Sequence, residues 1–543
     1  MIVNSDKTKP NMLDQIKEIQ DVFALWRSGK KQEAIQILLS LVKRYPDNPA
    51  VLVLAAEFVN EAGDIESSDE YVQKAMELDP DDEYSYVVKA TMLAERGMLH
   101  DAFELMNEAL QRPVKGYMAV EKAALTYKKY GLLEMAEKAY LRGFQVFPDH
   151  EEFWHSYAKM YKDAYMLDKY LEVLQSAVKK RPNDSHLWSE LGITAGNLGK
   201  NEDAWDALET TQKLVQDDME GLRKMGLLYQ AVEQYGKAEE YLRKSVQKDE
   251  NNIHSWAHLA LLLKLKGDEK GAKDAFSRAE KINKTHKDAL RFMSEKPPMK
   301  STELVYAQNA ESKFKAFLDG YKAHEDLKTL MPKLAEIHIL VGGDWLINGS
   351  PRFLEPSFAE GVLVFISALL AGKHDTNKAL GAMYGAIERS PNDTNLWLNM
   401  ANLLFQSQKS HGAYGAYKRA LSLDSFNIAA KAGLGLMSVN LKHFDDAITY
   451  LEDANSSVPG DYDILRGLAY SYLNTGDYGK AKEFCKNALN VNTSDANVYG
   501  FLVLAEQALG NSAASDEALK MCQKLDKGIA SQFEKARAPF RKR

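Results

Sequence analysis

Two histidines, His254 and His258 in the segment His-Ser-Trp-Ala-His, are the residues best spaced to bind a metal in this chain. On a helix the i, i+4 spacing puts both imidazoles on one face, as in metal sites built from paired histidines. No third ligand is evident in the sequence, and Trp256 between them occupies a position that recurs as a large apolar residue along the chain. We therefore expect two solvent-facing or groove-facing histidines and no metal site.

The residue patterns of known catalytic and nucleotide sites are absent from the sequence. It contains no G-x-x-x-x-G-K-[ST], G-x-S-x-G or H-E-x-x-H pattern. Gly342 and Gly343 follow a short apolar run, but no phosphate-loop spacing comes after them. Cys485 and Cys522 stand where other segments have apolar or small residues, which indicates packing. The carboxylates fall in loops and at expected helix starts, where they complement the helix dipole. We expect neither catalytic residues nor a cofactor.

The composition is that of a folded chain rich in helix. Hydrophobic residues make up 45% and charged residues 27% of the 543 residues, with only 15 prolines and 33 glycines. The net charge of −8 is not that of a nucleic-acid-binding chain, although a local basic patch stays possible. The N-terminal residues lack the apolar core of a signal peptide, and the apolar run 361–371 is too short to cross a bilayer. We expect an intracellular, cytoplasmic protein without a membrane segment.

A period of 34 residues runs through the chain in two trains. In the first train, prolines keep this spacing, with one of them a residue early, at Pro46, Pro80, Pro113, Pro148 and Pro182. The second train has the same period but another phase, at Pro391, Ser425, Pro459 and Thr493. Repetition at this period is typical of stacked helical repeats.

Small residues recur at a fixed place in these periods, twelve residues before the proline position. They are Ala34, Ala102, Ala136, Ala204, Ala238, Ala272, Ala379, Ala413, Ala447 and Ala481. Spacings of three, four and seven residues put them and their apolar neighbours on one helical face. Small side chains at a crossing let two antiparallel helices approach closely. The Pro-Asp/Asn segment ends the second helix of a period and supplies the N-cap of the next.

This pattern resembles the tetratricopeptide-repeat (TPR) family, with its W-x2-L-G/A-x2-Y class pattern, alanine pair and closing proline. Clear copies are SYVVKATMLAERGMLHDAFELMNEAL and WLNMANLLFQSQKSHGAYGAYKRALSLD. The resemblance implies an all-α fold, a TPR-type α-solenoid of about 13 repeats in two stacks. The predicted domains are an N-terminal solenoid over 1–284 with a degenerate first repeat, an irregular helical or loop joint over 285–357, a C-terminal solenoid over 358–527 and a basic tail over 528–543.

The joint does not keep the repeat pattern. We expect a helix over 302–330, a break at Pro332 and Gly-rich loops from Glu336 to Pro356. The sequence leaves two interpretations open. Residues 285–357 are either degenerate repeats with longer loops, or a hinge or docking element for a partner.

The TPR resemblance implies that the first helix of each repeat lines a concave surface. In the first train, basic residues fall at these inward positions and form a predicted partner-binding wall: Lys128, Lys129, Lys159, Lys162, Arg223, Lys224 and Lys264. In the second train the corresponding groove holds amide and aromatic residues: Asn399, Asn402, Phe405, Tyr470 and Asn474. The alternative for the basic wall is a solvated lysine face without a partner. The family's carboxylate clamp is present only as a fragment, namely Asn402 with Lys418 and Arg419.

A helical solenoid offers long surfaces rather than an enclosed reaction site. We therefore expect a non-catalytic scaffold or adaptor for protein–protein interaction, whose partner is an acidic, extended protein segment, with RNA as second choice. One alternative is a structural subunit of a large assembly, such as an RNA-decay or ubiquitin-ligase complex. The alternative from another class is an enzyme with TPR arms and a catalytic segment within 285–357, which is small for an enzyme core. The sequence does not determine the oligomeric state.

Overall fold

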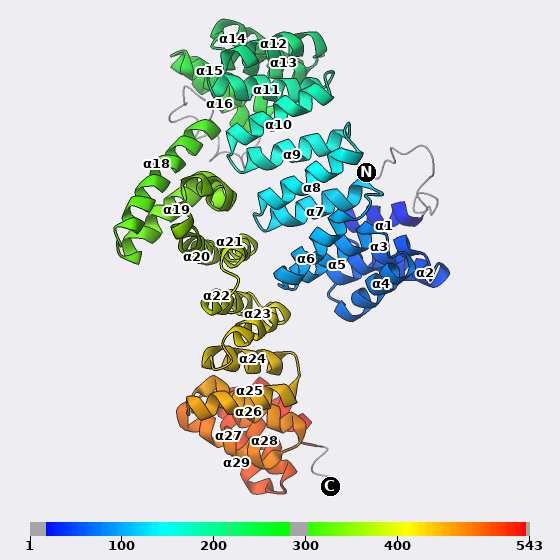
Figure 1. The fold of residues 1–543 in the computed structure, drawn as a ribbon, viewed down its shortest axis with the longest axis vertical. Helices are drawn as coiled ribbons and strands as arrows, with labels where there is room; N and C mark the ends of the chain where they lie inside the picture. The colour runs from blue at the N-terminus through cyan, green and yellow to red at the C-terminus, as the bar shows by residue number, and fades with distance from the viewer. Residues whose placement is uncertain (1–17, 216, 283–301, 539–543) are drawn as a thin grey trace. The chain divides into compact units, whose positions relative to one another are not determined.

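A computed structural model describes residues 18–215, 217–282 and 302–538, and within these ranges all regular secondary structure is helical (Figure 1). Figure 1 shows short helices that follow one another along each train, and consecutive helices such as α13 and α14 or α22 and α23 pack against each other. This arrangement confirms the predicted all-α solenoid fold. Residues 285–301 of the predicted joint and 539–543 of the predicted tail lie outside the described ranges.

The first train forms eight helix pairs, in which we call the first helix A and the second helix B. The pairs are α1 (Glu18–Arg27) and α2 (Lys31–Arg44), α3 (Pro49–Glu61) and α4 (Ile65–Leu78), α5 (Glu83–Glu95) and α6 (Leu99–Gln111), α7 (Tyr117–Lys129) and α8 (Leu133–Val146), α9 (Glu151–Asp163) and α10 (Leu167–Lys180), α11 (Ser185–Asn197) and α12 (Asn201–Leu214), α13 (Met219–Ala231) and α14 (Tyr235–Lys248), and α15 (Ile253–Leu265) and α16 (Glu269–Ile282).

The second train forms five pairs and ends in one more helix. They are α20 (Pro356–Gly372) and α21 (Thr376–Arg389), α22 (Thr394–Gln406) and α23 (Ser410–Leu423), α24 (Ile428–Asn440) and α25 (Phe444–Ser457), α26 (Tyr462–Thr475) and α27 (Tyr478–Val491), α28 (Ala496–Ala508) and α29 (Ser512–Leu525), followed by α30 (Lys527–Ala536). The predicted repeat numbers, eight and five, agree with the structure. Residues 527–536, which we assigned mainly to a tail, form α30, whose Phe533 packs on Phe501.

The helix starts repeat with the period of the sequence because the same local signals recur. Most A helices begin after an aspartate or asparagine whose side chain accepts a backbone N–H of the first turn, as Asp82, Asp184 and Asp393 do. The A–B turn contains a residue with left-handed backbone, usually glycine, for example Gly97 with φ +85°. Each signal lies within a few residues of the helix end that it defines, so that sequence alone locates it.

The recurring tryptophan of the A helices ties each pair to the preceding turn. The indole N–H of Trp154 donates to the carbonyl of Pro148 at 2.9 Å, and that of Trp397 donates to the carbonyl of Pro391 at 2.8 Å. Trp188 and Trp256 make the same bond to the residue six positions earlier. This bond connects the apolar body of the tryptophan, packed between helices, with the polar turn that separates two repeats.

The predicted small residues lie at the buried helix crossings. Ala34, Ala136, Ala238, Ala413 and Ala481 are all fully buried. A larger side chain at these places would separate the A and B helices, because protein interiors are close-packed. The core of the solenoid is therefore a continuous seam between helices and not one central cluster.

The middle segment is more helical than the sequence suggested. α18 (Thr302–Lys322) lies within the predicted helix 302–330. α19 (Leu327–Asp344) runs through Pro332, against the expected break, and bends at Gly342. Together with a π-helical turn η3 (Trp345–Gly349) and a 3-10 turn η4 (Ser350–Phe353), it replaces most of the loops expected over 336–356, and it packs against α18 as another helix pair. Leu330, Leu334, Ile337 and Val341 are buried along one face of α19. Their spacing of four, three and four residues is a helical signal, which the prolines and glycines of the segment obscured.

Two compact units make up the structure. Unit 1 comprises 1–112 with 383–543, and unit 2 comprises 113–382. Each unit therefore combines part of the first train with part of the later chain. In unit 2, Asn348 of η3 donates to the carbonyl of Gly131 at 2.6 Å and accepts the backbone N–H of Leu133 at 3.2 Å. The predicted boundaries near 284 and 357 remain predictions for separately folding pieces.

Candidate partner-binding surface

The predicted basic wall lies on the A helices of unit 2. Lys128 and Lys129 are on α7, Lys159 and Lys162 on α9, Arg223 and Lys224 on α13, and Lys264 on α15. Lys129 and Lys159 are exposed, and the other five are half-buried. In a solenoid the A helices of successive repeats lie side by side, and for this reason we predict that these residues share one surface.

Three of the seven cations are held by carboxylates of the same surface. Lys128 Nζ lies 3.0 Å from Asp163, Lys162 Nζ 2.5 Å from Glu190, and Arg223 Nη2 2.6 Å from Glu220. The wall is therefore mixed in charge. The sequence analysis missed Glu190 and Glu220 because it considered only basic residues on the A helices. The position within the repeat, which selected the cations, could have been applied to acidic residues as well.

Glu190 illustrates how firmly these carboxylates are bound. Burial raises the pKa of Glu190, but the charge of Lys162 and hydrogen bonds from Lys162 and Tyr170 outweigh it and hold the pKa below its usual range. Glu190 thus stays ionised and fixes Lys162, whose charge is mostly compensated.

Lys159, Lys224 and Lys264 differ from the other cations of the wall. None of them makes an ion pair within the part of the chain that the structure describes. Their charge is available to a partner without breaking an existing contact. They lie on α9, α13 and α15, so that they span four consecutive helix pairs.

The predicted histidine pair lies beside a cation instead of a further metal ligand. Arg223 Nη1 lies 3.4 Å from His258 Nε2, and burial, followed by the charge of Arg223, lowers the pKa of His258 to about 3. The imidazole is therefore neutral at physiological pH. The neighbouring guanidinium repels a metal cation, so that the geometry does not favour a metal at His254 and His258.

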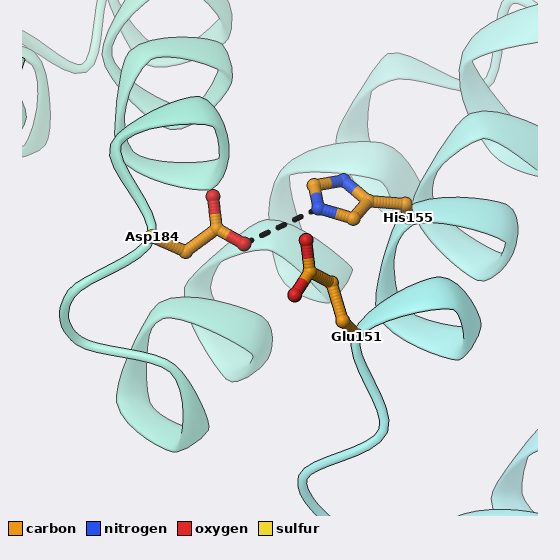
Figure 2. Close-up of side chains that lie close together, drawn as sticks. All are labelled: Glu151, His155 and Asp184. Carbon is orange, nitrogen blue, oxygen red and sulfur yellow. Dashed lines mark hydrogen bonds and ion pairs between the residues drawn. The ribbon is translucent and has the colours of Figure 1, made fainter. Parts of the chain in front are cut away.

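Another cluster, Glu151, His155 and Asp184, brings three potential metal ligands within 4.8 Å of one another. Figure 2 shows the three side chains turned toward one another, with His155 Nε2 at 3.2 Å from Asp184. Arg181 already binds this cluster, at 2.6 Å from Glu151 and 3.4 Å from Asp184, and Asp184 also caps α11. The contacts describe an ion-pair network that fastens the α10–α11 turn to α9.

The predicted C-terminal groove lies in unit 1, on α22 and α26. Asn399, Asn402 and Asn474 are exposed, and 48% of the Phe405 surface is accessible. Asn402 Oδ1 accepts the hydroxyl of Tyr417 at 2.6 Å, and Asn474 Nδ2 donates to its own helix. Asn399 and Phe405 are thus the members that offer polar and apolar surface to a partner.

Tyr470 belongs to a row of rings in the same groove. Its centroid lies 5.7 Å from that of Phe444 and 5.0 Å from that of Phe501, which in turn contacts Phe533 of α30. The sequence analysis named only Tyr470 of this row. Phe444 lies on the preceding B helix α25, and Phe501 and Phe533 lie on the later helices α28 and α30. No helix of the described residues has the length and apolar character needed to span a membrane.

Family models described as "Tetratricopeptide repeat" match residues 24–83, 253–286 and 439–505. The human antiviral innate immune response effector IFIT1 is 23% identical over 280 residues, which are 51% of this chain and 51% of that protein. Anaphase-promoting complex subunit 7 of Arabidopsis thaliana is 23% identical over 313 residues, 51% of this chain and 55% of the relative. The chain thus spans about half the length of these relatives.

Among solved structures, YrrB, described as a TPR protein with an unusual peptide-binding site, is 17% identical with a TM-score of 0.30. The likeness covers 32% of this chain and 91% of YrrB.

Proposed function

Because this chain belongs to the tetratricopeptide-repeat family, we propose that it is a protein-interaction scaffold. In this proposal unit 2 holds an acidic, extended segment of a partner protein along its A helices. The observation that carries it is the set Lys159, Lys224 and Lys264, three cations on one row of helices without an ion-pair partner among the described residues.

Electrostatics favour an acidic partner at this wall. Lys128, Lys162 and Arg223 are compensated by carboxylates, so that the excess positive charge comes from Lys159, Lys224 and Lys264. Cations on a shared surface add their potentials and accelerate the approach of an oppositely charged chain. An extended segment matches a row of side chains spread over several repeats better than a compact domain does.

A charge-reversal experiment tests the wall. The variant Lys159→Glu, Lys224→Glu, Lys264→Glu should bind an unstructured glutamate-rich peptide at least about tenfold more weakly at low salt, mainly through a slower association rate. The difference should shrink as ionic strength rises above about 0.15 M. Surface plasmon resonance at several salt concentrations measures both effects.

The control reverses three lysines of the B helices in the same unit. Lys138, Lys180 and Lys213 are exposed on α8, α10 and α12, and Lys138→Glu, Lys180→Glu, Lys213→Glu changes the net charge by the same amount. Equal loss of binding in both triple variants would show that net charge, not the wall, attracts the peptide. A single-stranded oligouridylate that binds more tightly than the peptide and depends on the same lysines would replace the proposed acidic protein segment with RNA.

We propose a second, weaker contact surface in unit 1, consisting of Asn399, Asn402, Phe405, Tyr470 and Asn474. The exposure of Phe405 and Asn399 supports it. Exposed aromatic groups beside amides suit a peptide backbone with an apolar side chain. Phe405→Ser should reduce the affinity of a partner that uses this surface. The free energy of unfolding should stay within about 0.5 kcal/mol of the wild-type value.

The proposal includes no reaction carried out by the chain itself. The helix pair α18–α19, which occupies the described part of the segment considered as a catalytic core, continues the solenoid packing. An activity screen of the purified chain against hydrolase and transferase substrates tests this part, and turnover that depends on residues 302–353 would overturn it.

A further inference from the structure

A cavity of about 160 Å³ in unit 1 is lined by none of the residues of the basic wall or of the predicted C-terminal groove. It is formed where the turn between α5 and α6 meets α21, α22 and α23. Apolar side chains dominate its lining, among them Met98, Leu99, Ile387, Trp397, Met400 and Leu404. All of these are buried except Met98, which is half-buried. The cavity therefore has a preformed apolar floor.

Hydrogen bonds to backbone carbonyls join the α5–α6 side of the cavity to its α22–α23 side. The N–H of Gly412 donates to the carbonyl of Arg96 at 3.2 Å, and Lys409 Nζ donates to the carbonyl of Glu95. A Cβ atom added to Gly412 would lie 2.5 Å from the backbone of Gly97. Such a close approach requires glycine and fixes the α5–α6 turn against α23.

The mouth of the cavity has a cation without an ion pair. Arg419 is exposed, and its guanidinium lies 6.0 Å from the centroid of Trp397. No carboxylate lies within ion-pair distance of Arg419 in the described ranges. The lining also contains His100, whose Nε2 lies 3.4 Å from a carboxylate oxygen of Glu104, and the exposed Asp101 of the first turn of α6. Arg419 is thus the group that attracts an anion, and Asp101 opposes it.

We propose that this cavity binds one large apolar side chain of a partner's peptide segment, with an adjacent acidic residue of that segment paired to Arg419. The proposal rests on the scaffold function but not on the basic wall of unit 2. Cavities of about 150 Å³ with apolar walls bind benzene-sized groups, so that a phenylalanine, leucine or methionine side chain fits. The apolar anchor supplies the affinity, and Arg419 orients the segment.

A fluorinated peptide tests the proposal on the full chain. The probe is an acetylated and amidated tripeptide, Glu-(4-fluoro-Phe)-Glu, observed by ¹⁹F nuclear magnetic resonance during titration. We expect saturable binding, with displacement by unlabelled Glu-Phe-Glu but not by Glu-Ala-Glu. A Lys-(4-fluoro-Phe)-Lys probe should bind about tenfold more weakly, because Arg419 then repels its flanks.

Position 415 provides a matched pair of variants. Gly415 lines the cavity on α23, and a Cβ atom added there meets nothing within 4 Å. Gly415→Phe should fill the cavity and abolish binding of the probe, whereas Gly415→Ala also replaces the helical glycine with a better helix former but leaves the cavity open. Binding that persists in Gly415→Phe overturns the proposal.

The two charges at the mouth provide a second, independent test. Arg419→Glu should weaken binding of the acidic probe about tenfold and Asp101→Asn should strengthen it, since both residues are exposed and the fold tolerates the changes. If circular dichroism shows that Gly415→Phe is unfolded, the variants Arg419→Glu and Asp101→Asn still test the proposal. The control variant Lys138→Glu, Lys180→Glu, Lys213→Glu, with the same change of net charge on exposed B-helix positions, should leave probe binding unchanged. Loss of probe binding in Lys159→Glu, Lys224→Glu, Lys264→Glu, with no effect of Arg419→Glu, would assign the probe to the basic wall and overturn the cavity.

Discussion

At the scale of single residues, the side chains on the A helices of unit 2 differ in how far their charges are compensated. Glu190 forms an ion pair with Lys162 and accepts a hydrogen bond from the Tyr170 hydroxyl. Asp163 forms an ion pair with Lys128, and Glu220 forms one with Arg223. Glu190 and Glu220 are half-buried, and a half-buried carboxylate that loses its cation remains poorly solvated, so we expect these two pairs to resist substitution more than the pair of the exposed Asp163 does. The cations outside such pairs are the ones that can exchange water for a partner.

Glu190→Gln tests this view through its pH dependence. The folded pKa of Glu190 is lowered, so its charge stabilises the fold fully above the unfolded pKa of about 4.3 and progressively less as pH falls through the folded value. We expect Glu190→Gln to cost about 1–2 kcal/mol at pH 7 and to approach wild-type stability at pH 3. Thermal melts at both pH values measure this difference.

The control for Glu190→Gln is Glu172→Gln, which removes an exposed carboxylate 3.3 Å from Lys169. It should change stability by less than about 0.5 kcal/mol at either pH. A pH-independent cost of Glu190→Gln would mean that lost packing, and not charge, destabilises the variant.

At the scale of the helix pair, stability comes from the seam where A and B helices cross. Ala272 is 2% exposed on α16, the helix that packs against α15. Each pair contacts mainly the pairs before and after it, so that damage at one seam should stay local.

Ala272→Trp should overpack the seam between α15 and α16 and cost about 1–3 kcal/mol. Hydrogen exchange should increase in α13 to α16, whereas α24 to α29 should keep their protection. The control is Lys273→Trp, which places the same side chain on the exposed neighbouring position of the same helix. An equal rise of exchange throughout both trains after Ala272→Trp would contradict local cooperativity.

At the scale of the whole molecule, contacts between distant parts of the sequence shape each unit. In unit 1 the α5–α6 turn lies against α23 through Gly97 and Gly412. In unit 2 the α7–α8 turn is held by Asn348 of η3, more than two hundred residues later. The repeat pattern alone would allow the two trains to form separate solenoids without contact. The contacts of Gly97 with Gly412 and of Asn348 with the α7–α8 turn are not specified by that pattern.

Gly412→Ala tests the contact in unit 1. A methyl group there would overlap the backbone of Gly97, so we expect the α5–α6 turn to separate from α23 while both helices remain folded. Hydrogen exchange should rise at 95–101 and 409–413. Gly415→Ala on the same helix meets open space and should leave both segments protected. Unchanged protection in Gly412→Ala would show that the close approach is not required.

The sequence by itself determined the helix pairs, their period and their packing seams, because the signals for these are local. Caps, left-handed turns and alanines at fixed spacing recur in each repeat, so that a reader of the sequence finds Asp82, Gly97 or Ala136 without knowing the fold. It also placed the cations of the wall on the A helices, since the repeat position fixes the helix face.

Only the tertiary structure decided which charges are compensated and where distant segments meet. Asp163 and Glu190 reach their cations across neighbouring repeats, and their pairing depends on side-chain geometry that no spacing rule specifies. The cavity under Arg419 requires residues near 98 and near 400 to come together, which loop closure over about three hundred residues leaves undetermined until packing selects one arrangement. The helical middle segment was undetermined for the same reason: packing of the buried face keeps α19 helical through Pro332, and the helix bends only at Gly342.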